Sequence, residues 1–339
     1  MLGGKTLISI IIPIYNNEDT LATCLNSVMQ SSRDFEVILV NNGSTDSSVE
    51  ICESYREKDS RIMVVHMDHD NPAHVYNNGL FAANGRYVHF IDPHDYLEDG
   101  AIDAVANLLL QNTDVVFLES STDHPNFWDI SHNNALRRLC RAVPDKVWDK
   151  LIRRELLLEN DIIFTDGIIW EEVDFCMKLY LYAKTYDAID FTYYHHSKKA
   201  PVSPSNQIDD NEELFGKIIL TLSKWAGPAE STYQDYSTFI HSWMSLMYCD
   251  IIVPLYSTLS PNTRNIYKPG MEDFRWLLEH SHKSRTIKIL YMIFGPFITS
   301  KLIQYKNRYI SPAKSSGIID IVHKKVNFIS TDSRANVRR

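Results

Sequence analysis

A short acidic segment with one histidine, Asp92-Pro93-His94-Asp95, directly follows an apolar run. Carboxylate oxygens and imidazole nitrogens bind Mn²⁺ and Mg²⁺, and such an ion can bridge to a diphosphate. The same residues also suit a turn in which an aspartate caps a helix before Leu97 and Ala101. Residue types and spacing therefore leave two interpretations open, a divalent metal site and a structural turn.

His94 decides which metal such a site would prefer. An imidazole is a softer ligand than a carboxylate, so a site with Asp92 and His94 favours Mn²⁺, with Mg²⁺ as the second candidate. A second imidazole from His195 or His196 would complete the ligand set. The alternative is that His94 hydrogen-bonds a phosphate and holds no metal.

A pair of carboxylates, Glu171-Glu172, stands directly after Trp170. A carboxylate can take the proton of an attacking hydroxyl as a general base. Acidic residues are also common in the first turn of a helix, where they interact favourably with the helix dipole. The apolar residues that follow, among them Phe175 and Leu179, predict such a helix. Position alone is therefore compatible with both roles.

The candidate residues lie at the ends of predicted strands that alternate with helices. Residues 7–14 form a continuous apolar run that ends in Tyr15-Asn16, which is typical of a strand buried on both faces. Further strands are predicted at residues 35–40, 62–66, 87–91, 114–118 and 188–193, and helices after the potential cap Asn17 and at residues 47–58, 73–83 and 100–111. This order predicts an α/β fold, a doubly wound, mostly parallel sheet with helices on both faces. Ligands of such sheets bind beyond the carboxyl ends of the strands, where Tyr15-Asn16, Asn41-Asn42 and Asp92 lie.

Two domains are predicted, residues 1–205 and residues 206–339. From about Ile208 the sequence becomes helical, with helices predicted near residues 212–225, 233–256, 271–282 and 286–308. Four prolines, Pro254, Pro261, Pro269 and Pro296, are expected to separate these segments. The second domain is therefore expected to be a helical region with a basic tail.

Charge is distributed unevenly along the chain, whose net charge is -9. Residues 261–339 contain 15 Lys and Arg against 5 Asp and Glu, a balance of +10, which leaves -19 for residues 1–260. The acidic first part argues against nucleic acid as a partner, whereas the basic tail suits an anionic surface.

One tail segment, residues 287–310, combines apolar residues with Lys288, Lys301, Lys306 and Arg308. This pattern suits a helix in a membrane interface with its basic groups toward anionic lipid, and equally a helix packed on the rest of the protein. No apolar stretch reaches the roughly 20 residues of a spanning helix, and no secretory signal is recognisable. The five cysteines, without CxxC spacing, suit a reducing compartment. We therefore expect a cytoplasmic protein that, on the membrane interpretation, is peripheral on the inner face of the plasma membrane.

Six segments, in their order and spacing, resemble family-2-type glycosyltransferases with the GT-A fold. The resemblance extends from residue 7 to about residue 205. The segments are Ile10-Ile11-Ile12-Pro13-Ile14-Tyr15-Asn16, Val40-Asn41-Asn42-Gly43-Ser44-Thr45-Asp46-Ser47, Asn77-Asn78-Gly79-Leu80 with Ala83-Asn84-Gly85-Arg86-Tyr87, Phe90-Ile91-Asp92-Pro93-His94-Asp95, Trp148-Asp149-Lys150-Leu151-Ile152-Arg153-Arg154 and Trp170-Glu171-Glu172-Val173-Asp174-Phe175.

This resemblance implies an inverting transfer of a hexosyl or N-acetylhexosaminyl group from a nucleotide diphosphate sugar, in first place a UDP-sugar. The implied acceptor is a hydroxyl of a glycan or glycolipid, such as a growing lipopolysaccharide or capsule. A divalent metal would assist departure of the diphosphate, and a carboxylate would act as base.

Residue roles follow from the motif positions. Glu172 matches the general base, with Glu171 beside it as the other catalytic candidate, and Asp92 faces the ribose and diphosphate. Residues 193–196 stand where the family has a loop that closes over the diphosphate, the alternative being an ordinary polar loop. His94 stands at the family's metal-ligand position beside Asp92, and His195 and His196 complete the predicted set of metal ligands. The implied nucleotide-sugar site comprises Pro13, Tyr15, Asn16, Glu18, Asn41, Asn42, Tyr76, Asn77, Asp92 and Pro93.

Four departures from the family pattern bear on these roles. Asn41-Asn42 stands in place of two aspartates, Tyr76 in place of an arginine, and His94 and Glu172 each in place of an aspartate. An amide can donate as well as accept a hydrogen bond, so recognition of the base can change. The departures leave open a second function, a catalytically impaired nucleotide-binding or scaffold subunit of a glycan-assembly complex. A dinucleotide oxidoreductase is disfavoured because no GxGxxG follows the first strand.

Overall fold

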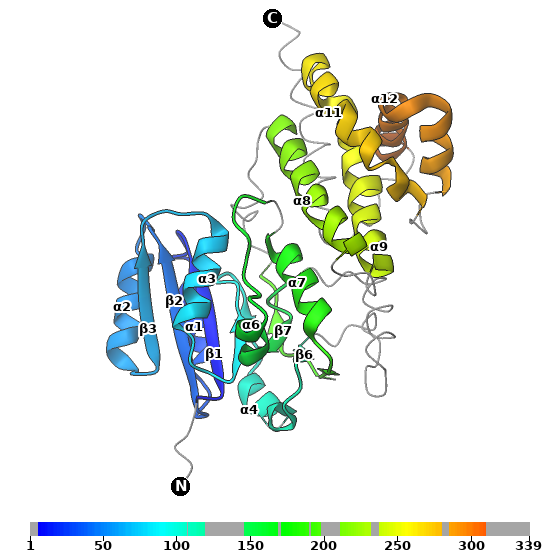
Figure 1. The fold of residues 1–339 in the computed structure, drawn as a ribbon. Coiled ribbons are helices and arrows are strands. Elements are labelled where there is room, and N and C mark those ends of the chain that lie inside the picture. Colours follow the sequence, from blue (N-terminus) through cyan, green and yellow to red (C-terminus); the bar gives the residue numbers. More distant parts are fainter. Residues whose placement is uncertain are drawn as a thin grey trace, which may run out of the picture. The chain divides into compact units, whose positions relative to one another are not determined.

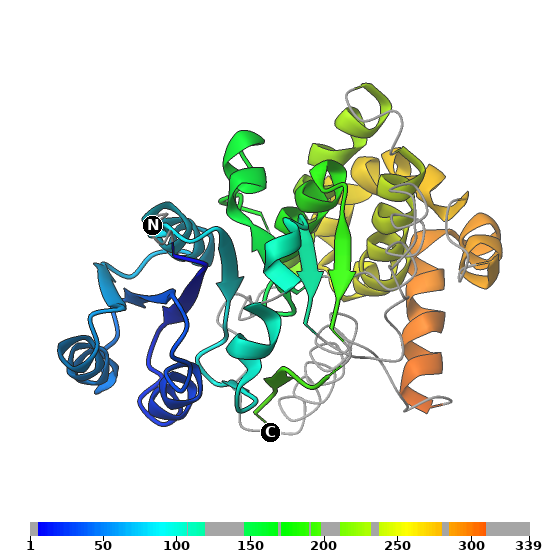
Figure 2. The same cartoon turned by 90° about the horizontal axis from the view of Figure 1, so that it is seen from below.

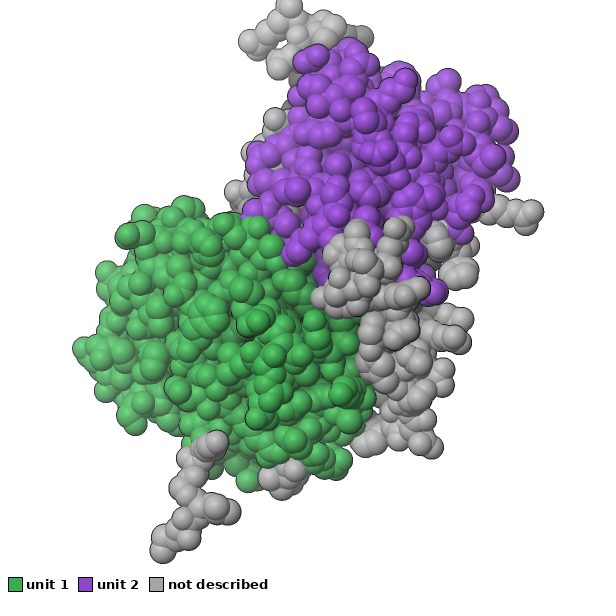
Figure 3. All heavy atoms as spheres, viewed as in Figure 1, with its two compact units in different colours: residues 1–166, 170–205 green, residues 167–169, 206–339 purple. Residues whose placement is uncertain are grey.

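The computed structural model describes residues 6–106, 108–118, 146–168, 171–189, 191–197, 211–231, 237–279 and 285–309. The chain divides into two compact units, which Figure 3 shows in different colours. Unit 1 consists of residues 1–166 and 170–205, and unit 2 of residues 167–169 and 206–339. All candidate catalytic, nucleotide-binding and metal-binding residues belong to unit 1.

Unit 1 is built on a seven-stranded sheet with the strand order β3-β2-β1-β4-β7-β6-β8 (Figure 1). The strands are β1 (Ile8–Ile14), β2 (Phe35–Asn42), β3 (Ile62–Met67), β4 (Tyr87–Phe90), β6 (Val115–Phe117), β7 (Lys150–Arg153) and β8 (Tyr186–Ala188). β1 to β4 are parallel to one another and β6 is parallel to β8, whereas β7 is antiparallel to β4 and β6. The predicted mostly parallel α/β sheet is therefore confirmed, although β7 was not predicted.

Helices cover both faces of this sheet, as Figure 2 shows for its first strands. Alternate residues of β1 explain the arrangement, because Ile10 and Ile12 pack in one core cluster with Leu25 of α1, whereas Ile11 faces Gly79 of α3. The helices of unit 1 are α1 (Leu21–Val28), α2 (Ser48–Lys58), α3 (Pro72–Ala82), α4 (Ala101–Ala106), the 3₁₀ helix η1 (Leu108–Gln111), α6 (Arg154–Glu159) and α7 (Glu171–Tyr182). A second, two-stranded sheet pairs β5 (Tyr96–Leu97) with β9 (Tyr194–His195).

α3 lies unusually close to the sheet at Gly79. A Cβ atom at this position would lie 2.3 Å from Cγ2 of Ile11 and 3.2 Å from Cγ2 of Val40. Since protein interiors are closely packed, only a residue without a side chain allows this approach. The contact fixes α3, and with it Tyr76 and Asn77, relative to β1 and β2.

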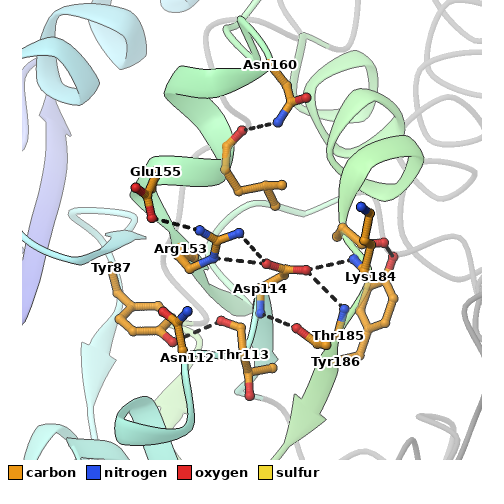
Figure 4. Close-up of polar contacts among 12 residues, drawn as sticks. Tyr87, Asn112, Thr113, Asp114, Arg153, Glu155, Asn160, Lys184, Thr185 and Tyr186 are labelled. Carbon is orange, nitrogen blue, oxygen red and sulfur yellow. Dashed lines mark hydrogen bonds and ion pairs between the residues drawn. The ribbon is translucent and has the colours of Figure 1, made fainter.

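Asp114 connects three strands of unit 1 (Figure 4). Its Oδ1 accepts hydrogen bonds from Nε and Nη2 of Arg153 on β7 at 3.0 and 2.8 Å, and its Oδ2 accepts from the backbone N–H groups of Lys184 and Thr185, before β8, at 2.8 and 3.1 Å. Burial alone would raise the pKa of Asp114, but the hydrogen bonds from Lys184, Arg153 and Thr185 outweigh it and hold this pKa below its ordinary value. The ionised carboxylate therefore joins β6, β7 and the start of β8.

Unit 2 is built from helices. They are α8 (Asn211–Ser231), α9 (Ser237–Met247), the π-helix η4 (Tyr248–Ile252), α10 (Val253–Leu255), the 3₁₀ helix η5 (Tyr256–Thr258), α11 (Pro261–Asp273), the 3₁₀ helix η6 (Arg275–Glu279) and α12 (Arg285–Tyr309). In its core the hydroxyl of Tyr248 donates to the carbonyl of Met271 at 2.6 Å and lies 3.1 Å from the hydroxyl of Tyr291. These contacts join η4, α11 and α12.

Some predicted helix boundaries in unit 2 are wrong. A helix was predicted over residues 271–282, but α11 ends at Asp273 and the 3₁₀ helix η6 follows. Pro269 lies inside α11 and does not separate two helices. Pro296 does mark a break, because Gly295 before it has φ 73° and kinks α12. Within the described part of the chain, no helix is long and apolar enough to cross a membrane.

Candidate active site

The loops after β1 and β2 are held together by hydrogen bonds. The backbone N–H of Asn16, a residue with φ 53°, donates to Oγ of Ser44 at 3.1 Å. The carboxylate of Glu18 accepts from the backbone N–H of Ser47 at 2.9 Å. Pro13 lies near the end of β1, in register with β2. The carboxyl ends of the two strands thus meet at one edge of the sheet, as predicted for parallel neighbours.

The side-chain amide of Asn42 binds the loop after β3. Its Nδ2 donates to the carbonyl of Asp70 and its Oδ1 accepts from the N–H of Asp70, both at 2.9 Å. The amide of Asn41 accepts from the backbone of its own loop at 3.2 Å, and the ring of Tyr15 lies 4.6 Å from that of His69. These contacts shape the edge of the sheet, and a role of Asn41 or Asn42 toward a nucleoside base stays a prediction.

Asp92 and Asp95 lie in a turn just after β4, with Pro93 buried between them, and we call residues 92–95 the acidic turn. Oδ1 of Asp92 accepts from the backbone N–H of His94 at 2.9 Å, and the N–H of Asp92 donates to the hydroxyl oxygen of Tyr194 at 3.0 Å. Burial raises the pKa of Asp92, an effect that the hydrogen bond from His94 reduces and the charge of Asp95 reinforces. A carboxylate destabilised in this way is a place where a cation gains stability.

Both ring nitrogens of His94 have hydrogen-bond partners. Nε2 lies 3.1 Å from Nδ2 of Asn17, and Nδ1 lies 3.1 Å from Oγ1 of Thr20. For His94 to bind a metal, one of these contacts has to open. The sequence pattern predicts Asn17 as a helix cap and gives no sign of its contact with His94, whereas α1 begins after Thr20.

The two histidines proposed as further ligands have different partners. Nδ1 of His196 lies 3.0 Å from Oδ2 of Asp95, so the structure brings His196 to the acidic turn. Nε2 of His195 lies 2.5 Å from Oε2 of Glu98, and its ring stacks on Tyr96 at 4.8 Å. Among the residues described, no group of three or more His, Cys, Asp or Glu side chains is arranged to hold a metal ion. The four-residue ligand set therefore stays a prediction.

Glu172 lies in the first turn of α7 and contacts α3. Its Oε1 accepts a hydrogen bond from the hydroxyl of Tyr76 at 3.1 Å. Burial, together with the charges of Glu172, Asp92 and Glu171, raises the pKa of Tyr76 well above its ordinary value, so the hydroxyl keeps its proton and acts as the donor. Glu171 itself is buried. The structure thus brings Tyr76, whose motif position implies a nucleotide contact, to the candidate base.

Tyr76 belongs to a cluster of four aromatic rings, which we call the aromatic stack and which comprises Tyr76, Phe90, Phe164 and Phe175. Phe164 stacks on Tyr76 at 4.5 Å and on Phe175 at 4.2 Å, and Phe90 meets all three rings edge-on. Asn77 holds Phe164 in place, because its Nδ2 donates to the Phe164 carbonyl and its Oδ1 accepts from the Phe164 N–H, both at 2.9 Å. These contacts of Asn77 are structural, and its nucleotide role stays a prediction.

Residues 9–165 match the family model described as Glycosyl transferase family 2. EpsJ of Bacillus subtilis, an uncharacterized glycosyltransferase, is 33% identical over 183 residues, which cover 49% of this chain and 53% of that protein. The cholesterol galactosyltransferase of Borreliella burgdorferi is 28% identical over 261 residues, which cover 69% of this chain and 72% of that protein. The chain thus spans about half the length of EpsJ.

Solved structures of glycosyltransferases have a similar fold. TarS 1-349 of S. aureus, in complex with UDP-GlcNAc, has a TM-score of 0.68 at 20% identity, covering 89% of this chain and 91% of that chain. The mannosyltransferase PcManGT from Pyrobaculum calidifontis, in complex with GDP-Man and Mn2+, has a TM-score of 0.51 at 14% identity, covering 91% and 88%. Residues 9–165 of this chain are therefore similar to glycosyl transferase family 2, and the chain has the GT-A fold of the solved glycosyltransferase structures.

Proposed function

We propose that this chain transfers a hexosyl or N-acetylhexosaminyl group, with inversion, from a UDP-sugar to a hydroxyl of a bacterial surface glycan or glycolipid. The family match supports glycosyl transfer, and the complex of TarS with UDP-GlcNAc supports a UDP-sugar as donor. One observation carries the proposal. The carboxylate of Glu172 accepts a hydrogen bond from the hydroxyl of Tyr76, and the charge of Asp92 helps to raise the pKa of that same hydroxyl. This supports one site for the candidate base and the carboxylate that we assign to the donor.

In the proposed reaction, Glu172 takes the proton of the acceptor hydroxyl while that oxygen bonds to the anomeric carbon. The bond between this carbon and the diphosphate breaks, the electron pair leaves with the diphosphate, and the configuration inverts. Glu171 is the neighbouring carboxylate, but consecutive side chains on a helix point about 100° apart, so it does not share the role.

We assign the donor to the carboxyl ends of β1, β2 and β4. Tyr15 and Asn42 would line the nucleoside, and Asp92 would face the ribose and the diphosphate. The network around Asn16 and Glu18 supports this assignment because it holds the loops after β1 and β2 at a fixed separation. The catalytic domain then consists of residues 1–205, and residues 206–339 form a separate helical domain.

The acidic turn fits a divalent metal through carboxylate oxygen, which is a hard ligand suited to Mn²⁺ and Mg²⁺. Asp92 would hold the ion, with His94 or His196 as a nitrogen ligand. Such an ion offsets the charge of the departing diphosphate. The raised pKa of Asp92 supports a cation there, and the PcManGT complex with GDP-Man and Mn2+ supports Mn²⁺.

A donor-hydrolysis and transfer assay tests this proposal. The purified chain is incubated with a panel of UDP-hexoses and UDP-N-acetylhexosamines in the presence of Mn²⁺, and released UDP is measured. Glu172→Gln keeps the shape but removes the basicity, so we expect turnover to fall by about 10²-fold or more, with UDP affinity by calorimetry nearly unchanged. Glu171→Gln is the matched control and should retain most of the turnover.

Two outcomes would contradict the proposal. Loss of turnover in Glu171→Gln with normal turnover in Glu172→Gln would show that Glu171, and not Glu172, is the base. Binding of UDP without turnover of any donor in the unmodified chain would favour the second function, a nucleotide-binding or scaffold subunit.

We also propose that the C-terminal helical region binds an anionic membrane surface at the inner face of the plasma membrane. α12 contains five basic residues and no acidic residue. It exposes large apolar side chains, among them Met292 at 60% and Ile293 at 66%. Basic groups beside exposed apolar side chains suit an interfacial helix, and each basic residue near such a surface contributes about 1 kcal/mol.

Co-sedimentation with vesicles tests the membrane proposal. We expect the chain to bind phosphatidylglycerol vesicles and to be released as salt rises, because screening weakens surface electrostatics. A Met292→Ser and Ile293→Ser double variant should bind less, and an Ile266→Ser variant, which removes an exposed apolar side chain of α11, should bind like the unmodified chain. Binding that depends on neither lipid charge nor ionic strength would contradict the proposal.

A further inference from the structure

The hydroxyl of Tyr76 is aimed at the proposed base by a rigid support. Tyr76 belongs to α3, which Gly79 fixes against the sheet, and its ring lies between the stacked ring of Phe164 and the edge-on ring of Phe90. Phe164 and Phe90 are both 1% exposed. A ring held on these sides cannot swing away from Glu172 without opening the core.

The same support carries the base itself. Phe175 lies on α7, one turn after Glu172, and stacks on Phe164 at an interplanar angle of 11°. Tyr76 and Phe164 stack at 15°. The aromatic stack therefore runs from the residue that donates the hydrogen bond to the helix that carries its acceptor, and it fixes the distance between the two.

The charges around this hydroxyl explain why a neutral donor is suited to the position. The charges that raise the pKa of this hydroxyl most are those of Glu172, Asp92 and Glu171, and all three are acidic. Tyrosine donates one hydrogen bond and brings no positive charge, so the carboxylate keeps more of its basicity than beside an arginine, the residue that the family pattern has here.

We infer that Tyr76 is a positioning residue for catalysis, whose hydroxyl holds the carboxylate of Glu172 in the orientation that accepts the proton of the acceptor hydroxyl. This inference rests on the proposed function of Glu172 as base. It replaces the sequence-based assignment of Tyr76 to the nucleotide. It also makes the pair formed by Tyr76 and Glu172 a unit, so that their effects on turnover should not be independent.

Tyr76→Phe tests the inference because it removes only the hydroxyl and keeps the ring of the aromatic stack. We expect kcat to fall about tenfold with the KM for the UDP-sugar within about twofold, since the lost contact acts on the base and not on the donor. Without the hydrogen bond from Tyr76 the carboxylate takes up a proton more readily, so the acid limb of the kcat profile should move to higher pH.

Two further variants separate positioning from simple loss of stability. Tyr87→Phe is the control, because the buried Tyr87 hydroxyl donates to the carbonyl of Thr113 at 2.9 Å and not to Glu172. It should lower the melting temperature without moving the acid limb. In a Glu172→Gln background, Tyr76→Phe should lower the residual rate less than twofold, because the group it positions is already inactive.

The outcomes distinguish this inference from the proposed function. If Glu172→Gln remains active, the assignment of the base fails. If Glu172→Gln is inactive while Tyr76→Phe has the kcat and pH profile of the unmodified chain, the base stands and the positioning role is wrong. A raised KM for the donor with unchanged kcat in Tyr76→Phe would indicate that Tyr76 binds the nucleotide sugar, and it would also overturn the inference.

Discussion

Asp114→Asn should destabilise unit 1 markedly, because the carboxylate accepts four hydrogen bonds, of which an amide oxygen can keep only two. If the amide oxygen faces Arg153, the amide NH₂ meets the N–H groups of Lys184 and Thr185, and the reverse orientation sets NH₂ against Arg153. The Asp114 side chain is only 8% exposed, so water does not compensate. Breaking one partner of a buried ion pair costs about 3–5 kcal/mol.

We expect the lower end of this range, about 3 kcal/mol, because Arg153 keeps a second partner, Glu155, at 3.0 Å. For a unit of this size, each kcal/mol lowers the melting temperature by about 2–4 °C, which gives a decrease of about 6–12 °C at pH 7. Thermal unfolding followed by differential scanning fluorimetry measures this shift. Glu155→Gln is the control, since that side chain is 69% exposed and its pair with Arg153 contributes little.

The pH dependence of this shift follows from the lowered pKa of Asp114 in the folded state. Its stabilising effect is complete above the unfolded-state pKa of about 3.9 and is lost as the pH falls through the lower folded-state value. The difference in melting temperature between the unmodified chain and Asp114→Asn should therefore be constant from pH 7 to about 5 and shrink below about 4. A shift under 1 °C at pH 7, or one that grows on acidification, would refute this reasoning.

Two further substitutions test the support of the candidate site. Gly79→Ala should lower the free energy of unfolding by about 1–3 kcal/mol through overpacking, since the new Cβ would lie 2.3 Å from Cγ2 of Ile11. A melting temperature equal to that of the unmodified chain would show that α3 can shift. Asn77→Ala should lower the free energy of unfolding by about 2–4 kcal/mol, because the N–H and carbonyl of Phe164 both lose their hydrogen bond to Asn77. It should also lower kcat, since Phe164 supports Tyr76. A stability loss with normal kcat would argue against that support.

The first half of the sheet could be predicted from sequence because β1 and β2 are apolar strands buried on both faces, and the edge strand β3 is also rich in apolar residues. β1, β2 and β3 begin within one residue of their predicted starts, since long apolar, β-branched runs have few other stable places in a fold. β7 could not be predicted, because it is only four residues long and begins and ends with a basic residue. Its basic side chains form ion pairs with acidic residues outside the strand, as Arg153 does with Asp114. Such ion pairs produce no regular pattern of apolar residues from which a strand could be predicted.

The candidate site was predictable in its location but not in its internal contacts. Tyr15, Asn42 and Asp92 lie at strand ends, as the alternation of strands and helices implied. The partners of individual side chains are separated by long stretches of chain, 96 residues for Tyr76 and Glu172 and 77 for Asn17 and His94. Local patterns therefore indicated which residues could act, and only the fold determines which of them meet.

The aromatic stack has a consequence for how this protein can change over evolution or by design. Its rings belong to the hydrophobic interior, yet they set the position of the proposed base through Tyr76 and α7. A substitution such as Phe175→Leu would therefore alter turnover as well as stability, because Phe175 acts on the proposed base through the aromatic stack. Interior volume and catalytic rate cannot be adjusted separately here, so a library that aims at new acceptors should leave these four rings unchanged and vary the loops at the strand ends.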